Sequence, residues 1–161
     1  MLSLPIDTHK TAFLELLKSH SGIVVSAPPG TGKSTRVPLY CHEWNKSVDT
    51  AECDRIMVLQ PRRLAAISLA TRVAEEHGTQ LGATIGYKVR GAQAISANSE
   101  IHFQTYGHFF EELKGNPTLA HISVIILDEF HERQVEMDII WAWIHYLKQR
   151  GLPTPKTVLM S

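Results

Sequence analysis

The residues best suited to chemistry lie at positions 27–34, where the sequence reads Ala-Pro-Pro-Gly-Thr-Gly-Lys-Ser. Gly30 and Gly32 permit a backbone whose amide groups close around phosphate oxygens, and Lys33 supplies positive charge for the β and γ phosphates. Ser34 offers a hydroxyl ligand to Mg²⁺. The strict P-loop pattern has glycine at its first position, where this chain has alanine. The motif still predicts a nucleotide site, and the simpler alternative is a glycine turn with a solvated lysine.

Two acidic residues follow the most apolar run of the chain. Residues 122–127 are almost continuously apolar, which is typical of a central strand covered on both faces. Asp128, at the end of that run, is suited to hold hydrated Mg²⁺, and Glu129 to position and deprotonate an attacking water. Glu129 could also contact the metal directly. The alternative is that helix amides or Arg133 satisfy both carboxylates.

Composition places these motifs in one ordinary globular domain. The chain has 161 residues, 43% of them hydrophobic, and 16 basic side chains balance 16 acidic ones. A net charge of zero gives no overall basic field for a nucleic-acid or membrane partner. Two cysteines exclude a disulfide-built scaffold, and the apolar runs are too short to span a membrane. Because charged residues interrupt the N-terminal apolar positions, we expect no export signal and a cytoplasmic protein.

Short β-branched runs alternate with amphipathic stretches, as an α/β fold with a mostly parallel sheet and helices on both faces requires. Helices are expected around residues 13–17 and over 34–44, 64–78, 109–114 and 135–149. Strands are expected over residues 23–25, 55–60, 100–106, 122–127 and 156–160, with a short strand and loop within 82–97. The first strand is expected to be buried and residues 45–54 to form a surface connection. This order places the P-loop between a strand and its helix, and Asp128 at a strand end.

Three motifs together resemble the DEAH-box helicases of superfamily 2. They are the P-loop, Pro61-Arg62-Arg63-Leu64-Ala65-Ala66, and Asp128-Glu129-Phe130-His131-Glu132-Arg133, which is most similar to the bacterial HrpB branch. The resemblance runs from about residue 10 to residue 161 and keeps the family's motif order. It implies a first RecA-like, P-loop NTPase domain that uses ATP and Mg²⁺ and binds single-stranded RNA or DNA.

The resemblance also implies roles at the nucleotide site. The catalytic residues would be Lys33, Asp128, Glu129 and His131, with His131 linking the γ-phosphate to motif III. The metal ligands would be Ser34, Asp128 and Glu129. The nucleotide-binding residues would be Pro29, Gly30, Thr31, Gly32, Lys33, Ser34, Thr35 and Arg72. Arg72 would stack on the base, and its alternative is an exposed helix arginine.

Nucleic-acid contacts are implied for Arg62, Arg63, Arg90 and Thr105. Arginines after a strand can bind strand phosphates, although one of the two neighbours could instead pair with a carboxylate of this chain. Position 106 departs from the family, because Tyr106 stands where an acidic residue is usual. Trp141 and Trp143 could stack on bases, but packing or a domain contact is favoured.

The resemblance implies that a second RecA-like domain and C-terminal domains of a longer chain complete the enzyme. Ser161 matches the first residue of motif III, so we expect a fragment with little ATPase activity alone. Two other hypotheses remain open from the residues. One is a small-molecule kinase or other P-loop phosphotransferase, and the other is a non-catalytic nucleic-acid-binding or scaffold domain.

Overall fold

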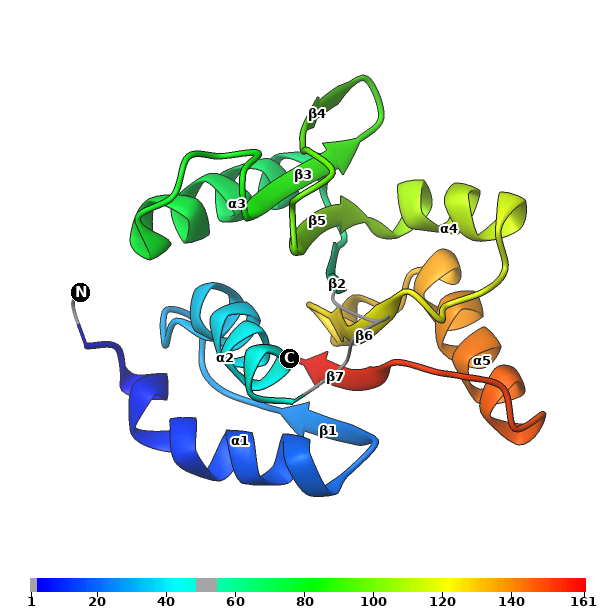
Figure 1. The fold of residues 1–161 in the computed structure, drawn as a ribbon, viewed down its shortest axis with the longest axis horizontal. Coiled ribbons are helices and arrows are strands. Elements are labelled where there is room, and N and C mark those ends of the chain that lie inside the picture. The colour runs from blue at the N-terminus through cyan, green and yellow to red at the C-terminus, as the bar shows by residue number, and fades with distance from the viewer. Residues whose placement is uncertain (1–2, 49–54) are drawn as a thin grey trace.

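Seven strands form one sheet in the computed structural model, which describes residues 3–48 and 55–161 (Figure 1). In chain order they are β1 Gly22–Val25, β2 Arg55–Gln60, β3 Ile85–Val89, β4 Ala92–Ala94, β5 Ile101–Thr105, β6 Ile122–Leu127 and β7 Lys156–Met160. Their order across the sheet is β1-β7-β6-β2-β5-β3-β4. Every neighbouring pair is parallel except the β3-β4 hairpin. The predicted mostly parallel α/β fold is therefore confirmed.

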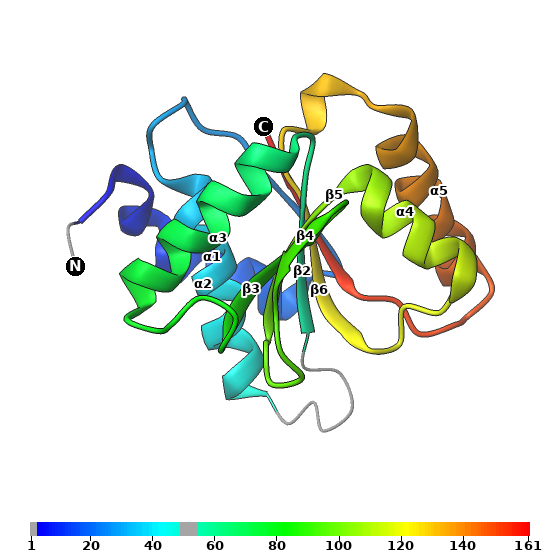
Figure 2. The ribbon, with the colours of Figure 1, turned by 90° about the horizontal axis from the view of Figure 1, so that it is seen from above.

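Helices cover both faces of this sheet (Figure 2). The helical elements are η1 Pro5–His9, α1 Lys10–Ser19, α2 Lys33–Ser47, α3 Arg63–His77, α4 Tyr106–Gly115, η2 Phe130–Glu132 and α5 Val135–Gln149. The helices α1, α2 and α3 lie on one face, and α4 and α5 lie on the other. Because neighbouring parallel strands end at the same edge, the loops that follow β1, β6, β2 and β5 meet there.

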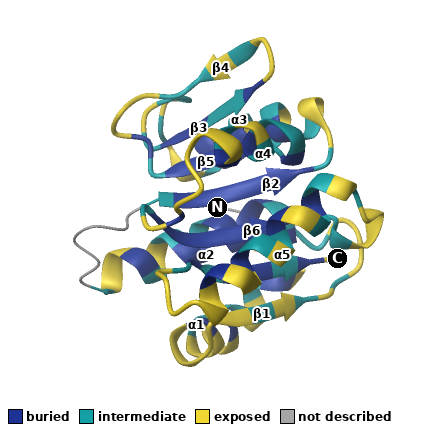
Figure 3. Ribbon diagram, turned by 90° about the vertical axis from the view of Figure 1, so that its right-hand side faces the viewer, coloured by how far each residue is buried: buried dark blue, intermediate teal, exposed yellow. Residues whose placement is uncertain are grey.

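The central strands separate two apolar cores. In β2, Ile56 and Val58 face the core under α1, α2 and α3, whereas Met57 and Leu59 face the core under α4 and α5. All six residues of β6 are buried, which explains its almost continuous apolar run (Figure 3). This strand therefore holds Asp128 on a rigid base.

The expectation that the strand over 23–25 is buried is wrong. β1 is an edge strand that pairs with β7, and the Val24 side chain is 71% exposed. A cavity of about 330 Å³ lies between β1 and α5, lined by Val24 and Ile144 among others. An apolar run predicts burial only when a helix packs against its face, and here α5 stands away from Val24.

Three expected boundaries also differ. α2 continues to Ser47 and buries Asn45, so the predicted surface connection does not begin at residue 45. The remainder of that connection, residues 49–54, lies outside the described residues. The region 82–97 holds two strands, β3 and β4, instead of one. The fourth helix begins at Tyr106 instead of 109, because the Thr105 hydroxyl caps it by accepting the His108 amide hydrogen at 3.3 Å.

Both tryptophans of α5 pack against the protein, as expected. The Trp141 ring meets Phe130 edge-on at 6.0 Å, and Trp143 stacks on Tyr146 at 5.1 Å. The Trp143 indole N–H also donates to the Pro117 carbonyl at 3.0 Å. Of the helices in residues 3–48 and 55–161, none combines the length and apolar composition that a bilayer crossing needs.

Candidate functional site

The P-loop follows the edge strand β1 and ends where α2 begins. Gly30 has φ of +79° and Gly32 has φ of +92°, a left-handed conformation that other residues rarely adopt. A side chain at Gly32 would also collide with Leu4, since an ideal Cβ would lie 2.5 Å from its Cδ1. Because α2 begins at Lys33, the amides and dipole of its first turn favour an anion at the loop.

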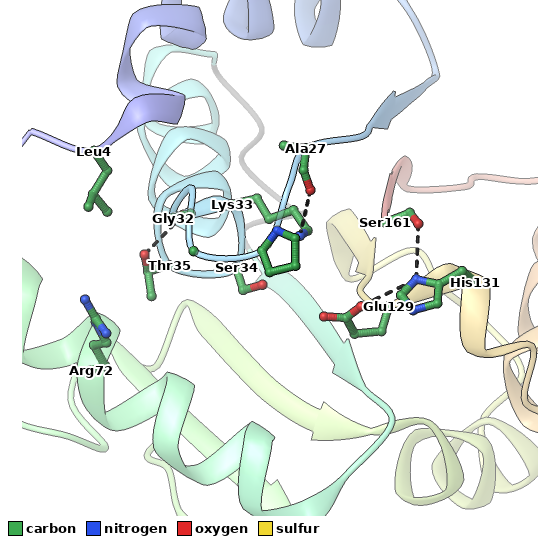
Figure 4. Close-up of a pocket in the computed structure, with 12 residues that line it drawn as sticks. Leu4, Ala27, Gly32, Lys33, Ser34, Thr35, Arg72, Glu129, His131 and Ser161 are labelled. Atoms are coloured by element: carbon green, nitrogen blue, oxygen red, sulfur yellow. Dashed lines mark hydrogen bonds and ion pairs between the residues drawn. The ribbon is translucent and has the colours of Figure 1, made fainter.

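Lys33 folds back over the loop that it terminates. Its side chain is largely buried, and its Nζ donates to the Ala27 carbonyl at 3.1 Å (Figure 4). An ammonium group has three donors. The same nitrogen can therefore contact a phosphate oxygen while it keeps the loop closed.

A cavity of about 380 Å³ lies over this loop. Its walls include most predicted nucleotide-binding residues: Pro29, Gly30, Gly32, Lys33, Ser34, Thr35 and Arg72. Glu129 and His131 line it from the acidic motif (Figure 4). Thr31 and Asp128 do not form its walls. The Thr31 hydroxyl instead donates to the Pro28 carbonyl at 2.9 Å, and Asp128 is buried with 1% exposure.

Sequence reasoning missed the N-terminal segment as part of this site. Leu4 lines the cavity, and the Ile6 amide donates to the Thr31 carbonyl at 3.2 Å. The Asp7 carboxylate accepts the Leu4 amide hydrogen at 2.7 Å, which caps η1. Proline at position 5 and an acidic residue at position 7 are a helix-start pattern that could have revealed this element. The N-terminal segment thus packs against the outer side of the P-loop.

A chain of charges connects Arg72 to that segment. The exposed Arg72 donates to Glu76 at 3.0 Å, and Glu76 also accepts from the buried Arg36 at 3.0 Å. Arg36 lies 3.3 Å from Asp7. Hydrogen bonds from the Leu4 amide and the Tyr40 hydroxyl, with Arg36 nearby, hold the pKa of Asp7 below its ordinary value. The ionised Asp7 thus holds α2 and the N-terminal segment together beside the cavity.

Asp128 is fixed by two donors. The Gln60 side chain donates to its Oδ2 at 2.7 Å, and the Glu129 amide donates to its Oδ1 at 2.9 Å. Gln60 is the last residue of β2, is 1% exposed, and was not predicted as a site residue. The signal that could have found it is a polar side chain ending an apolar strand next to β6.

The turn after Asp128 has an unusual backbone. Glu129 has φ of +53° and Arg133 has φ of +51°, both in the left-handed region. The Tyr106 hydroxyl donates to the Asp128 carbonyl at 2.6 Å. Burial, followed by the nearby carboxylates of Asp128 and Glu129, raises the pKa of Tyr106 well above its ordinary value. Tyr106 therefore stays protonated and keeps donating.

His131 stands between the acidic motif and the end of β7. Its Nδ1 lies 3.1 Å from the Ser161 hydroxyl and 3.5 Å from the Glu129 carboxylate. Ser161 also lines the cavity, although it was not predicted as a site residue. The Ser161 carbonyl accepts the Ala27 amide hydrogen at 3.2 Å. The end of β7 therefore contacts both the P-loop and His131.

The donor set at this edge suits Mg²⁺. Among the described residues, no group of three or more His, Cys, Asp and Glu side chains could hold a metal ion. Mg²⁺ does not require one, because it keeps several waters and binds one or two carboxylates together with substrate phosphates. The Ser34 hydroxyl beside the cavity and the fixed Asp128 carboxylate fit that requirement.

The predicted nucleic-acid residues gather farther along the same edge. Arg62 and Arg63 follow β2, Thr105 ends β5, and Arg90 lies in the turn after β3. These three strands are neighbours and parallel. The three arginines are exposed and Thr105 is partly exposed.

One of these arginines contacts the acidic motif. The Arg62 guanidinium lies 3.2 Å from the Glu132 carboxylate, and the Arg62 side chain is 75% exposed. The alternative in which one arginine pairs with a carboxylate of the chain therefore holds for Arg62 in this structure. An exposed pair of this kind is weak, so a phosphate can compete for Arg62.

Comparisons with known proteins agree with this architecture. The family model described as DEAD/DEAH box helicase matches residues 7–161. The chain is 39% identical over 159 residues to the probable ATP-dependent RNA helicase DHR2 of Saccharomyces cerevisiae, covering 99% of this chain and 21% of that protein. It is 36% identical over 159 residues to the ATP-dependent RNA helicase HrpA homolog of Haemophilus influenzae, covering 99% of this chain and 12% of that protein.

A solved structure shows the same fold. The crystal structure of the Escherichia coli DEAH/RHA helicase HrpB aligns with 99% of this chain and 20% of its own, with a TM-score of 0.86 and 32% identity. The chain thus spans about a fifth or less of the lengths of these three proteins. The sequence resemblance to DEAH-box helicases is confirmed, and the chain belongs to the DEAD/DEAH box helicase family.

Proposed function

We propose that this chain is the first RecA-like motor domain of an ATP-dependent RNA helicase. The observation that carries the proposal is that Lys33, Ser34 and Glu129 line one cavity at the carboxyl edge of the sheet. Exposed arginines continue along the same edge. The nucleotide site and the strand-binding surface would thus lie on the same sheet. A shift of the loops at one site could therefore be transmitted through the sheet to the loops at the other.

Each side chain has a role that fits its position. Lys33 would bind the β and γ phosphates, and Arg72 would cover the base at the outer end of the cavity. Asp128 and Ser34 would hold Mg²⁺, which when bound neutralises charge on the phosphates. Glu129 would orient the attacking water and accept its proton. His131, held by Ser161, would connect the γ-phosphate to the end of β7.

A second RecA-like domain is part of this proposal. The relatives are several times longer than this chain, and in the DEAH-box family the second domain supplies an arginine finger and half of the nucleic-acid groove. We therefore expect the 161-residue chain to bind nucleotide weakly and to hydrolyse ATP very slowly. Single-stranded RNA is the expected partner, and a cytoplasmic location stays a prediction.

The family match favours a helicase over a small-molecule phosphotransferase. Two features of the molecule agree. The acidic motif includes Glu132, which reaches Arg62 on the neighbouring loop, and Thr105 and Arg90 extend that loop cluster along the edge. A small-molecule kinase needs an acceptor pocket beside the γ-phosphate, whereas exposed arginines along one edge suit the phosphates of a nucleic-acid strand.

The test compares ATP hydrolysis by the longer protein with and without single-stranded RNA, single-stranded DNA and small phosphate acceptors, at one stated salt concentration. We expect RNA to stimulate hydrolysis and small acceptors to receive no phosphate. The Glu129→Gln variant should retain nucleotide binding and hydrolyse ATP only at a strongly reduced, residual rate. Phosphate transfer to a small acceptor, or unchanged turnover in Glu129→Gln, would overturn the proposal.

A further inference from the structure

We propose that Tyr106 is a positioning residue that holds the Asp128–Glu129 peptide and thereby aims Glu129 at the attacking water. The inference rests on the proposed function, because it assigns Glu129 to water activation. Tyr106 is 1% exposed and its hydroxyl donates to the Asp128 carbonyl at 2.6 Å. It acts through another residue and does not line the nucleotide cavity.

Both polar groups of one peptide unit are held. Its carbonyl oxygen belongs to Asp128 and accepts from Tyr106, while its N–H belongs to Glu129 and donates to the Asp128 carboxylate at 2.9 Å. With both groups held, the peptide plane cannot rotate without breaking a hydrogen bond. The plane sets the direction of the next residue, and that residue is Glu129.

Glu129 needs such support because its backbone is in a conformation of high energy for a residue with a side chain. A φ of +53° at a glutamate is rare and persists only when surrounding contacts enforce it. From this position the Glu129 side chain lines the cavity and lies 3.5 Å from His131 (Figure 4). A relaxed backbone would move the carboxylate away from the site that the water must occupy.

The residue type at position 106 matters for this contact. The DEAH-box family usually has an acidic residue here, and an ionised carboxylate has no proton to donate to a carbonyl. Tyrosine has both the donor and the length to reach across from α4 to the end of β6. The link is therefore a feature of this chain's own sequence.

The same residue lies next to the nucleic-acid edge. Tyr106 is the first residue of α4, directly after Thr105, whose side chain caps that helix. A strand bound at Thr105 would shift or stiffen the start of α4. The Tyr106 hydroxyl would pass that change to Glu129, which gives a short physical path from the strand to the hydrolytic residue.

The first test measures kcat and KM for ATP in the longer protein, comparing wild type with Tyr106→Phe and with the control Tyr146→Phe. Tyr146 is half-exposed on α5 and its variant removes the same hydroxyl away from the cavity. We expect Tyr106→Phe to lower kcat roughly 3- to 10-fold, because one hydrogen bond is lost. The KM for ATP should stay within about twofold of the wild-type value. Unchanged kcat with a lowered melting temperature would show a merely structural role.

A double-mutant cycle tests whether Tyr106 acts through Glu129. In the Glu129→Gln background, single-turnover hydrolysis should fall less than about twofold on adding Tyr106→Phe, since the group being positioned is already gone. An equal loss in both backgrounds would overturn the proposal.

A third measurement does not depend on hydrolysis and uses the 161-residue chain. Hydrogen exchange at the Glu129 amide should become roughly 3- to 10-fold faster in Tyr106→Phe and stay unchanged in Tyr146→Phe. Equal exchange in all three proteins would overturn the positioning role. If exchange responds and the longer protein lacks RNA-stimulated hydrolysis, the proposed function fails while the structural link stands.

Discussion

Two parts of the carboxyl edge of the sheet differ in how they hold charge: Lys33 and Asp128, in the proposed nucleotide half, are buried, whereas the arginines after β2 and β3, in the proposed nucleic-acid half, are exposed. Lys33 and Asp128 are 7% and 1% exposed, and each is held by hydrogen bonds to the protein. On the other half, Arg62, Arg63 and Arg90 are exposed, and Arg62 has only a weak partner in Glu132. The two halves follow different strands of one sheet, and the difference lies in the loops after those strands.

The contrast fits the two kinds of ligand in the proposed function. A triphosphate presents a compact charge in one position, and stabilising a transition state there requires groups that are already in place. A nucleic-acid strand presents phosphates along a line, and exposed arginines can adjust to it at little cost. We therefore expect substitutions on the nucleotide half to have large effects on turnover, and those on the nucleic-acid half to have small, salt-dependent effects on binding.

The largest effect is expected for Lys33→Ala. Removing this buried cation should lower ATP hydrolysis by the longer protein about 100-fold or more, as removal of one preorganised donor typically does. Hydrolysis rates at saturating ATP measure the effect, and Lys18→Ala, which removes an exposed charge on α1, is the control. If the hydrolysis rate of Lys33→Ala fell by less than about tenfold, the nucleotide half would not depend on a preorganised cation.

A smaller loss is expected for Gln60→Leu. Without its donor, the Asp128 carboxylate should be less well oriented, and the Mg²⁺ concentration for half-maximal hydrolysis should rise about 10-fold or more. Gln104→Leu is a matched control, because Gln104 is also buried and donates to a carboxylate, that of Glu112, at 3.0 Å. A similar Mg²⁺ requirement in both variants would contradict a role for Gln60 at Asp128.

Arg63→Gln should have a modest effect that depends on salt. Loss of one phosphate contact should reduce the slope of log affinity against log salt by about one for single-stranded RNA, with KM for ATP unchanged. Fluorescence anisotropy at several salt concentrations gives this slope. Arg150→Gln, an exposed arginine after α5, is the control. An unchanged slope for Arg63→Gln would remove it from the strand-binding surface.

The smallest effect is expected for Glu132→Gln. The exposed pair with Arg62 is worth little, so releasing it should strengthen RNA binding by about twofold or less at low salt. The gain should vanish in an Arg62→Gln background, which anisotropy with the double variant can show. A large gain in RNA affinity would contradict the weak pair described here, because it would mean that Glu132 keeps Arg62 from binding the strand.

Much of the fold was predictable because local sequence patterns indicate its main elements. The almost continuous apolar run of β6 requires burial on both faces, and the glycines of the P-loop allow a left-handed backbone; the structure shows both. The exposure of Val24 could not be predicted, since a run of three apolar residues has the same sequence pattern at an edge as in the centre of a sheet. Leu4 and Gln60 were missed because they belong to the site through contacts with distant residues.

The sequence by itself identified the residue types suited to the proposed chemistry: glycines and a lysine suited to phosphates, carboxylates after an apolar strand, and arginines after other strands. These features depend on residue type and local spacing, so they can be recognised without knowledge of the packing. Tertiary structure alone decided that Gln60 and Tyr106 hold Asp128, and that Arg62 reaches Glu132. The partners in these three contacts are between 22 and 70 residues apart. Contacts across such separations depend on strand order and register, which local sequence does not specify.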